Sequence, residues 1–295
     1  MLTHLSLFSG IGGLDLAAEW AGFTTVGQCE FADYQTKVLE KHWPDVPRWR
    51  DIRTLTKESF YERTGLRTVD VLSGGFPCQP FSVAGKQKGK GDDRYLWPEM
   101  LRVIRELRPR CVIGENVPGI IKIAAGQVVK DLEQAGYHVV VFNFEAAAVG
   151  AWHRRSRVFF VGIADVADTG SDGRESGSAQ QGREAFKRRN DFCEQAGKPW
   201  GIKQPAGEGA VQRKGTIYDA VCGGCAGFAR REQSQEFAHG RCWAVEPDVG
   251  RVAHGIPARV DRLKCLGNAV VPQQAYPIFR ALRETIFDGM EEDTL

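Results

Sequence analysis

The sequence has almost no excess of charge of either sign, because 39 lysines and arginines are balanced by 37 aspartates and glutamates to give a formal net charge of +2. Such a balance gives no global electrostatic signal for nucleic acid, so a partner of that kind must be inferred from local features. The chain also lacks an uninterrupted apolar run of the ~20 residues that span a bilayer. No N-terminal stretch has the pattern of a secretory signal. We therefore expect a cytoplasmic protein without a membrane partner.

The sequence also lacks an internal repeat and an arrangement of cysteines typical of a disulfide framework. Its eight cysteines are scattered along 295 residues. Without a secretory signal, this distribution predicts reduced thiols. A hydrophobic content of 42% is enough for a full core, in one large domain or in two of unequal size.

Short β-rich runs alternate with helical patterns from residue 1 to about residue 164. This alternation is typical of an α/β fold, a parallel sheet with helices on both faces. The predicted helices cover 14–20, 34–42, about 96–107 and a stretch after Pro272. The predicted strands cover 5–8, 24–30, 69–75, 111–117, 138–144 and 157–164.

The composition changes near residue 165, where Gly, Ser, Gln and charged residues replace the β-branched ones. We predict a first domain at 1–164, a small irregular domain at 165–250, and a segment at 251–295 that completes the first domain. A disordered insertion is the alternative for 165–250. The aromatic residues of that stretch, which would supply a small core, include Trp200, Tyr218, Phe228 and Trp243.

The segment Phe8-Ser9-Gly10-Ile11-Gly12-Gly13 lies between the first predicted strand and helix. Glycines at such a turn let the backbone approach a nucleotide-like ligand, although they also occur for packing reasons. Their spacing is not the G-x-G-x-x-G of dinucleotide enzymes, which disfavours a nicotinamide-dependent dehydrogenase. Glu30 ends the next strand roughly 20 residues later, where an acidic side chain accepts hydrogen bonds from ribose hydroxyls in such folds. A solvated carboxylate is the alternative.

Three further residues suit an adenine ring near this turn. Phe8 and Phe31 would sandwich the ring, and Asp51, which precedes Ile52, would accept a hydrogen bond from its amino group. Ordinary core packing is the alternative interpretation of both aromatic residues.

Cys78 follows a buried strand in Gly74-Gly75-Phe76-Pro77-Cys78-Gln79-Pro80. It is therefore expected at the carboxyl edge of the sheet, where doubly wound folds bind ligands. Flanking Pro77 and Pro80 restrict the backbone and would hold the thiol in one direction. This frame favours a nucleophile over a buried structural cysteine.

Glu115 ends another strand and is expected at the same edge. If Glu115 is an acid near neutral pH, burial or a bound base must raise its pKa; a helix-capping carboxylate is the alternative. Arg155 and Arg157 alternate just before the last strand, so both would point into one pocket and hold a carbonyl oxygen, a phosphate or Glu115. A surface basic run is the competing interpretation.

Taken in order along the chain, these segments resemble the DNA (cytosine-5) methyltransferase family, bacterial and phage type. FSGIGG resembles the family's cofactor loop, CEF its ribose-contacting step, GGFPCQPFS its nucleophile loop and GENVPG its Glu-Asn-Val segment. HRRSR resembles the arginine motif, and GNAVVP resembles the C-terminal segment that completes the cofactor site. The resemblance covers roughly 1–164 and 250–295.

The resemblance implies a Rossmann-like sheet, S-adenosylmethionine as methyl donor, double-stranded DNA as substrate and a cytosine flipped out of the duplex. In that reaction the Cys78 thiolate adds to C6, which activates C5 for methylation, while Glu115 protonates or hydrogen-bonds N3. The implied catalytic set is Cys78, Glu115, Arg155 and Arg157. The implied cofactor set is Phe8, Gly10, Gly12, Gly13, Glu30, Phe31, Asp51, Ile52, Pro77, Leu96, Asn268 and Val270.

Within the resemblance, 165–250 is the target-recognition domain, and we expect a monomer that acts beside a cognate restriction endonuclease. His153 departs from the glutamine that usually begins the arginine motif. The residues Cys222, Cys225, His239 and Cys242 have zinc-like spacing, but we predict no metal, because two glycines between the first pair also suit a turn. A transfer RNA cytosine-5 methyltransferase and a DNA-binding regulator with little or no catalysis remain the alternative functions.

Overall fold

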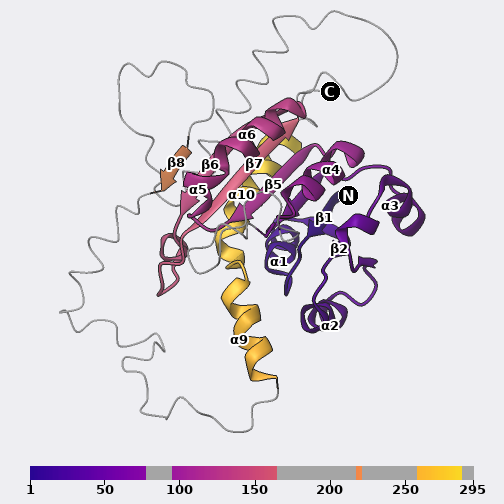
Figure 1. Cartoon of the computed structure of the whole chain (residues 1–295), viewed down its shortest axis with the longest axis horizontal. Helices are drawn as coiled ribbons and strands as arrows, with labels where there is room; N and C mark the ends of the chain where they lie inside the picture. Colours follow the sequence, from indigo (N-terminus) through magenta and orange to yellow (C-terminus); the bar gives the residue numbers. More distant parts are fainter. Residues whose placement is uncertain (78–94, 165–216, 221–257, 288–295) are drawn as a thin grey trace, which may run out of the picture.

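The computed structural model describes residues 1–77, 95–164, 217–220 and 258–287. The other residues are drawn in grey in Figure 1. The described strands form one sheet in the order β3-β2-β1-β4-β5-β7-β6-β8. Their bounds are β1 Leu2–Leu7, β2 Phe23–Cys29, β3 Arg48–Trp49, β4 Val71–Gly74, β5 Cys111–Asn116, β6 Tyr137–Phe144, β7 Arg157–Ala164 and β8 Ile217–Ala220. All six strands expected from the sequence are present.

The expectation of a wholly parallel sheet is wrong for β7, which lies between β5 and β6 and runs antiparallel to both. The cause is the connection from β6 to β7. It contains only the short 3-10 helix η3 (Ala146–Val149), whereas a parallel crossover usually carries a full helix across a face of the sheet. The chain therefore turns back directly after β6 and pairs Phe144 with Arg157.

Helices cover both faces of the sheet, as predicted (Figure 1). One face packs against α3 (Lys57–Thr64), α4 (Trp97–Leu107), α5 (Ile120–Ile123) and α6 (Ala125–Gln134). The other face packs against α1 (Gly13–Trp20), α10 (Pro272–Leu282) and the π-helical turn Arg283–Phe287. The remaining elements are α2 (Asp33–His42), the 3-10 helix η1 (Ile52–Thr54) and α9 (Arg259–Asn268), which projects away from the sheet.

The C-terminal helix α10 belongs to the same core as the N-terminal half of the chain. Its Phe279 is fully buried and lies edge-on to the His4 ring of β1, and Tyr276 contacts Trp20 of α1. The segment between α9 and α10 lies against the glycine turn that begins α1, where the Val270 carbonyl group faces Gly13.

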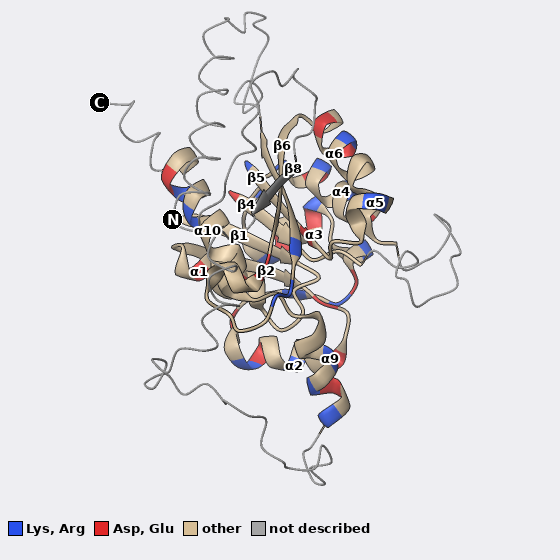
Figure 2. Ribbon diagram, turned by 90° about the vertical axis from the view of Figure 1, so that its left-hand side faces the viewer, with Lys and Arg blue, Asp and Glu red and all other residues tan. Residues whose placement is uncertain are grey.

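Acidic and basic residues are interspersed on the same helices in Figure 2, for example along α6 and α9. This mixture agrees with the near-zero net charge. Among the described residues, no helix is long and apolar enough to cross a membrane.

Candidate active site

The carboxyl ends of β4 and β5 lie side by side and bring two predicted segments together. The strands are parallel and pair Gly74 with Gly114. A Cβ atom added to Gly75 would lie 3.0 Å from Oε2 of Glu115. The chain that leads to Cys78 therefore passes so close to the Glu115 carboxylate that a side chain at position 75 would crowd it.

Asn116 anchors the beginning of the predicted nucleophile loop. Its buried side-chain amide donates a 2.9 Å hydrogen bond from Nδ2 to the carbonyl oxygen of Phe76. Phe76 is itself buried between Trp97 and Phe160. Pro77, which follows, is half-buried, and Cys78 lies outside the described residues. The GENV segment thus supplies an anchoring residue, Asn116, that was not among the predicted site residues.

Glu115 forms a buried ion pair with Arg157. The distance from Arg157 Nε to Glu115 Oε1 is 2.8 Å, and the two side chains are 11% and 9% exposed. Burial raises the pKa of Glu115 to about 7, although the positive charges of Arg157 and Arg155 act in the opposite direction. The carboxyl group is therefore poised to exchange a proton near neutral pH.

Arg155 reaches the C-terminal segment. Its Nη2 donates hydrogen bonds to the carbonyl oxygens of Leu266 at 3.0 Å, Gly267 at 2.7 Å and Ala269. Glu115 was one of the partners predicted for the two arginines. Arg157 contacts it directly, whereas Arg155 acts on the Glu115 carboxylate through its charge.

A pocket opens at this edge of the sheet between the glycine turn, Glu115 and the segment that follows α9. Five of its residues are predicted site positions, namely Gly10, Gly13, Glu115, Asn268 and Val270. The other lining residues, which were not among the predicted site positions, are Ser9, Ile11, Leu14, Gln35, Gly75, Cys265 and Ala269. Cys265 is buried, and burial raises the pKa of its thiol. Local sequence patterns gave no signal for it, because its position depends on how α9 packs.

The three glycines of the turn have different roles. Gly10 has a φ of 58°, and no heavy atom lies within 4 Å of the position of an added Cβ, so the space above it is open. At Gly12, with a φ of 88°, a Cβ would lie 2.4 Å from the Trp43 ring. At Gly13 it would lie 2.7 Å from the carbonyl oxygen of Val270. Packing therefore explains Gly12 and Gly13, and Gly10 is the position left open for a ligand.

Glu30 is held at the mouth of the turn by two backbone amides. Its Oε2 accepts from the Gly10 amide at 2.8 Å and its Oε1 from the Ala32 amide at 2.9 Å. A carboxylate has about four acceptor positions, so capacity for ribose hydroxyls remains. Phe31 is 75% exposed and free to stack on a ring, whereas Phe8 is half-buried with a φ of 51° and packs against the core.

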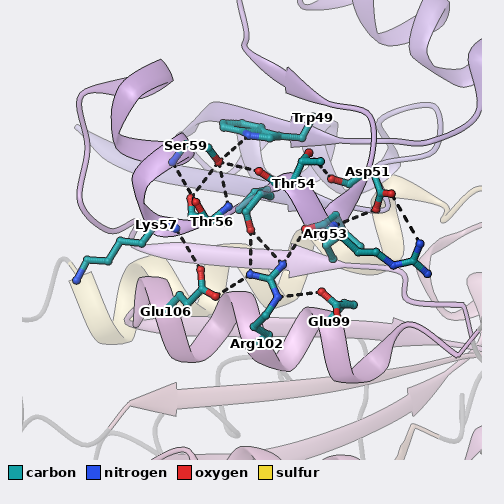
Figure 3. A network of polar contacts seen from close by, with 12 residues as sticks. Trp49, Asp51, Arg53, Thr54, Thr56, Lys57, Ser59, Glu99, Arg102 and Glu106 are labelled. Carbon is teal, nitrogen blue, oxygen red and sulfur yellow. Dashed lines mark hydrogen bonds and ion pairs between the residues drawn. The ribbon is translucent and has the colours of Figure 1, made fainter.

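Asp51 lies in a polar network that fixes the short helix η1 (Figure 3). Its Oδ1 accepts a 3.0 Å hydrogen bond from the Arg53 amide, and Ile52 is buried in the core. Arg102 of α4 donates to the carbonyl oxygens of Ile52 at 2.8 Å and Leu55 at 3.1 Å. The network therefore fixes the backbone that immediately follows Asp51.

Leu96, another position predicted to bind the cofactor, is half-buried and precedes α4. His153 is half-buried beside the exposed ring of Trp152, with a buried Nδ1 that has no partner among the described residues. Cys222, Cys225, His239 and Cys242 lie outside the described residues.

An S-adenosylmethionine-like cofactor fits these residues. The open Gly10 position provides room, Glu30 provides remaining acceptor capacity for a ribose, and Phe31 provides an exposed ring. The wall formed by Asn268, Ala269 and Val270 closes the pocket from the C-terminal side.

Two solved structures share this fold across nearly the whole chain. A prophage-encoded protein of Escherichia coli aligns with a TM-score of 0.59 and 20% identity, covering 97% of this chain and 99% of that one. The methyltransferase EhMeth of Entamoeba histolytica aligns with a TM-score of 0.55 and 12% identity, covering 96% and 98%. At these identities the likeness shows the fold alone.

Sequence comparison identifies the family. The Type II methyltransferase M.NgoFVII of Neisseria gonorrhoeae is 35% identical over 173 residues, which are 57% of this chain and 45% of the relative. M.AquIA of Picosynechococcus sp. is 36% identical over 174 residues, 54% of this chain and 70% of the relative. Apart from M.AquIA, the chain spans about half the length or less of such relatives. Because the family model for C-5 cytosine-specific DNA methylase matches residues 2–196, the chain belongs to that family.

Proposed function

We propose that the protein transfers a methyl group from S-adenosylmethionine to C5 of a cytosine in a specific double-stranded DNA sequence. The observation that carries this proposal is the buried carboxyl group of Glu115, which is paired with Arg157 beside the root of the Cys78 loop and lines the pocket behind Gly10. Family membership and the Type II methyltransferases among the relatives support DNA as the substrate.

Cys78 is the proposed nucleophile. Its thiolate adds to C6 of the cytosine, forms a C6–S bond and moves electron density to C5, which is otherwise a poor carbon nucleophile. The hydrogen bond from Asn116 to the Phe76 carbonyl and the burial of Phe76 fix the backbone two residues before this thiol. Loss of the C5 proton to a base later releases the thiolate and restores the aromatic ring.

Glu115 is the proposed acid at N3. Addition at C6 places negative charge toward N3, so a proton or a hydrogen bond from Glu115 lowers the barrier. A pKa raised to about 7 keeps a large fraction of this carboxyl group protonated at neutral pH. Reaching a base inside a duplex requires that the base be flipped out of the stack.

Gly10, Glu30, Phe31, Asp51, Asn268 and Val270 are the residues proposed to bind the cofactor. Bound S-adenosylmethionine supplies the methyl group as an electrophilic sulfonium. Glu30 would bind its ribose, Phe31 would stack on its adenine, and Asp51 would accept from the adenine amino group. Residues 165–250 are the proposed target-recognition domain. We further propose that the protein is a cytoplasmic monomer that acts beside a cognate restriction endonuclease.

Methyl transfer and covalent trapping test the function. We expect the purified protein to incorporate radioactive methyl groups into duplex DNA and not into transfer RNA, and bisulfite sequencing of DNA from expressing cells to reveal the recognised site. Duplex DNA that contains 5-fluorocytosine should form a stable adduct with the parent protein, because fluorine cannot leave C5 as a proton does.

Cys78→Ala should abolish both methylation and adduct, and Cys111→Ala, at the amino end of β5 and so at the opposite edge of the sheet, should retain both where it is folded. Methylation that persists in Cys78→Ala would refute the nucleophile. Preferential methylation of transfer RNA would favour the RNA enzyme. Band-shift binding by Cys78→Ser, together with absent methylation by the parent, would favour the DNA-binding regulator.

A further inference from the structure

Gln274, at the beginning of α10, bridges the two ends of the connection between β6 and β7. Its side chain is fully buried. Nε2 donates one hydrogen bond to the carbonyl oxygen of Phe144 at 3.1 Å and another to the carbonyl oxygen of Arg155 at 3.0 Å. Phe144 ends β6 and Arg155 lies just before β7, so one amide group closes the base of the loop that carries Arg155 and leads into Arg157 of β7.

Arg155 makes the reverse contact, from this loop to the C-terminal segment. Its Nη2 donates to the carbonyl oxygens of Leu266, Gly267 and Ala269, at the end of α9. Arg155 also has a φ of 40°, a left-handed conformation that a side chain disfavours. Such a conformation persists when surrounding contacts fix it, and here the side chain and the carbonyl oxygen of the same residue are both bonded.

These reciprocal hydrogen bonds form a clasp, which we define as the contacts of Arg155 with residues 266–269 and of Gln274 with the Arg155 carbonyl. The turn at residues 268–271 is held at two points. The Arg155 side chain bonds to the Ala269 carbonyl within the turn, and Gln274, which follows the turn, bonds to the Arg155 carbonyl. Asn268, Ala269 and Val270 form the C-terminal wall of the pocket, and the Val270 carbonyl lies against Gly13.

We propose that Gln274 is a positioning residue for methyl-donor binding, because its hydrogen bond to Arg155 fixes the turn that forms the C-terminal wall of the pocket. This inference rests on the proposed function for the identity of the donor. Gln274 does not line the pocket, so it acts through Arg155 and residues 268–270 and not by contact with the ligand.

The chemistry of the site requires an amide at position 274. The carbonyl oxygens of Phe144 and Arg155, in a buried and a partly buried contact, both accept from this side chain, and glutamine supplies two N–H groups from one nitrogen. Methionine has a similar length and packs in an apolar surrounding, but it donates nothing, so Gln274→Met removes the hydrogen bonds with little change of volume. Gln273, one residue earlier in the same turn, is exposed and provides the matched control Gln273→Met.

The test measures binding of S-adenosylhomocysteine, the demethylated product of the donor, by titration calorimetry with the full chain at a temperature well below every unfolding midpoint. We expect Gln274→Met to weaken binding about tenfold. This factor corresponds to the net contribution of one typical hydrogen bond to the position of the pocket wall. Under methylation conditions, the KM for S-adenosylmethionine should rise more than kcat falls. Gln273→Met should match the parent in each measurement.

Unchanged donor affinity in a folded Gln274→Met protein would overturn the inference, whether its unfolding midpoint fell or its kcat fell. If that variant fails to fold, Arg155→Lys provides the second test, since lysine keeps the charge but lacks the planar fork that serves several carbonyls. Weaker binding of S-adenosylhomocysteine by Arg155→Lys would support the clasp, and parental binding would refute it. A parent that binds S-adenosylhomocysteine without methylating DNA would contradict the proposed function while leaving this test readable.

Discussion

Arg157 Nε lies 2.8 Å from Glu115 Oε1, and the two side chains share a buried position where antiparallel β7 lies against the end of β5. The arginine lowers the pKa of this carboxyl group, yet burial outweighs the arginine and raises that pKa to about 7. At neutral pH about half of the Glu115 carboxyl groups are therefore protonated beside the guanidinium, which suits a group that donates a proton to a bound base.

This relationship predicts how activity depends on pH. An acid with a raised pKa is active when protonated, so the methylation rate at saturating substrates should fall as the pH rises through about 7. Glu115→Gln should lower the rate about 10²- to 10⁴-fold and remove this limb of the profile. Rapid-quench rates between pH 5.5 and pH 9 measure both effects, with exposed Glu62→Gln as the control. A parental limb that survives in Glu115→Gln would exclude Glu115 as its origin.

A second buried carboxyl group predicts a pH-dependent stability. Asp15 is fully buried in α1, where it accepts hydrogen bonds from Ser6 Oγ at 2.9 Å and Gln28 Nε2 at 2.8 Å. Burial raises the pKa of Asp15 from 3.8 to about 6 despite these bonds. Because the folded protein holds the proton more tightly, the stabilisation is complete below pH 3.8 and is lost as the pH rises through about 6.

Asp15→Asn should remove this dependence. Relative to the variant, the parent should lose about 2 kcal/mol of unfolding free energy between pH 4 and pH 7, measured by urea unfolding. Asp45→Asn, at an exposed position, should keep the parental dependence. Parallel curves for the parent and Asp15→Asn would show that the Asp15 pKa is not raised.

The strands and the order of the segments could be predicted from sequence because each depends on local patterns. β5 and β7 are nearly continuous apolar runs bounded by polar residues, which is typical of strands buried on both faces. The antiparallel insertion of β7 depends instead on the lack of a full crossover helix between β6 and β7 and on where β7 pairs. Periodicity within a strand carries no information about the direction of its neighbour.

The site shows the same division. Glu115 was predicted from its place at the end of a strand, and the structure places it beside the Gly75 backbone. Gln274 and the partners of Arg155 were not predicted, because their hydrogen bonds join residues more than 100 positions apart. A buried glutamine that satisfies backbone carbonyls has no local sequence signature.

The glycine turn predicts that two similar substitutions have different consequences. Gly12→Ala would place a methyl group 2.4 Å from Trp43 ring atoms in a left-handed backbone, so it should lower the unfolding free energy by about 2–4 kcal/mol. Gly10→Ala meets open space and should cost only about 1–2 kcal/mol from its backbone conformation.

The affinity for the methyl donor should depend on the same two glycines in the opposite order, with the larger loss at Gly10. A methyl group at Gly10 occupies the open space above the turn, so Gly10→Ala should weaken binding of S-adenosylhomocysteine more than Gly12→Ala does, provided that both are measured where they are folded. Calorimetric titration and urea unfolding give the two quantities. Equal losses of affinity would indicate that the donor does not approach Gly10.

Arg102 predicts an effect on donor binding from a residue on the helix behind the site (Figure 3). Its guanidinium pairs with Glu99 at 2.9 Å and Glu106 at 2.7 Å and donates to the carbonyl oxygens of the first residue of η1, Ile52, and of the residue after it, Leu55. Arg102→Met leaves both carbonyls without this donor, so it should lower the unfolding free energy by about 2 kcal/mol and weaken donor binding through Asp51. The ion pairs are about one-third exposed and add little, since solvent screens them.

Exposed Arg105→Met on the same helix should change stability by less than about 0.5 kcal/mol. Urea unfolding and titration with S-adenosylhomocysteine measure the two effects, and an Arg102→Met protein indistinguishable from Arg105→Met would separate η1 from the cofactor site.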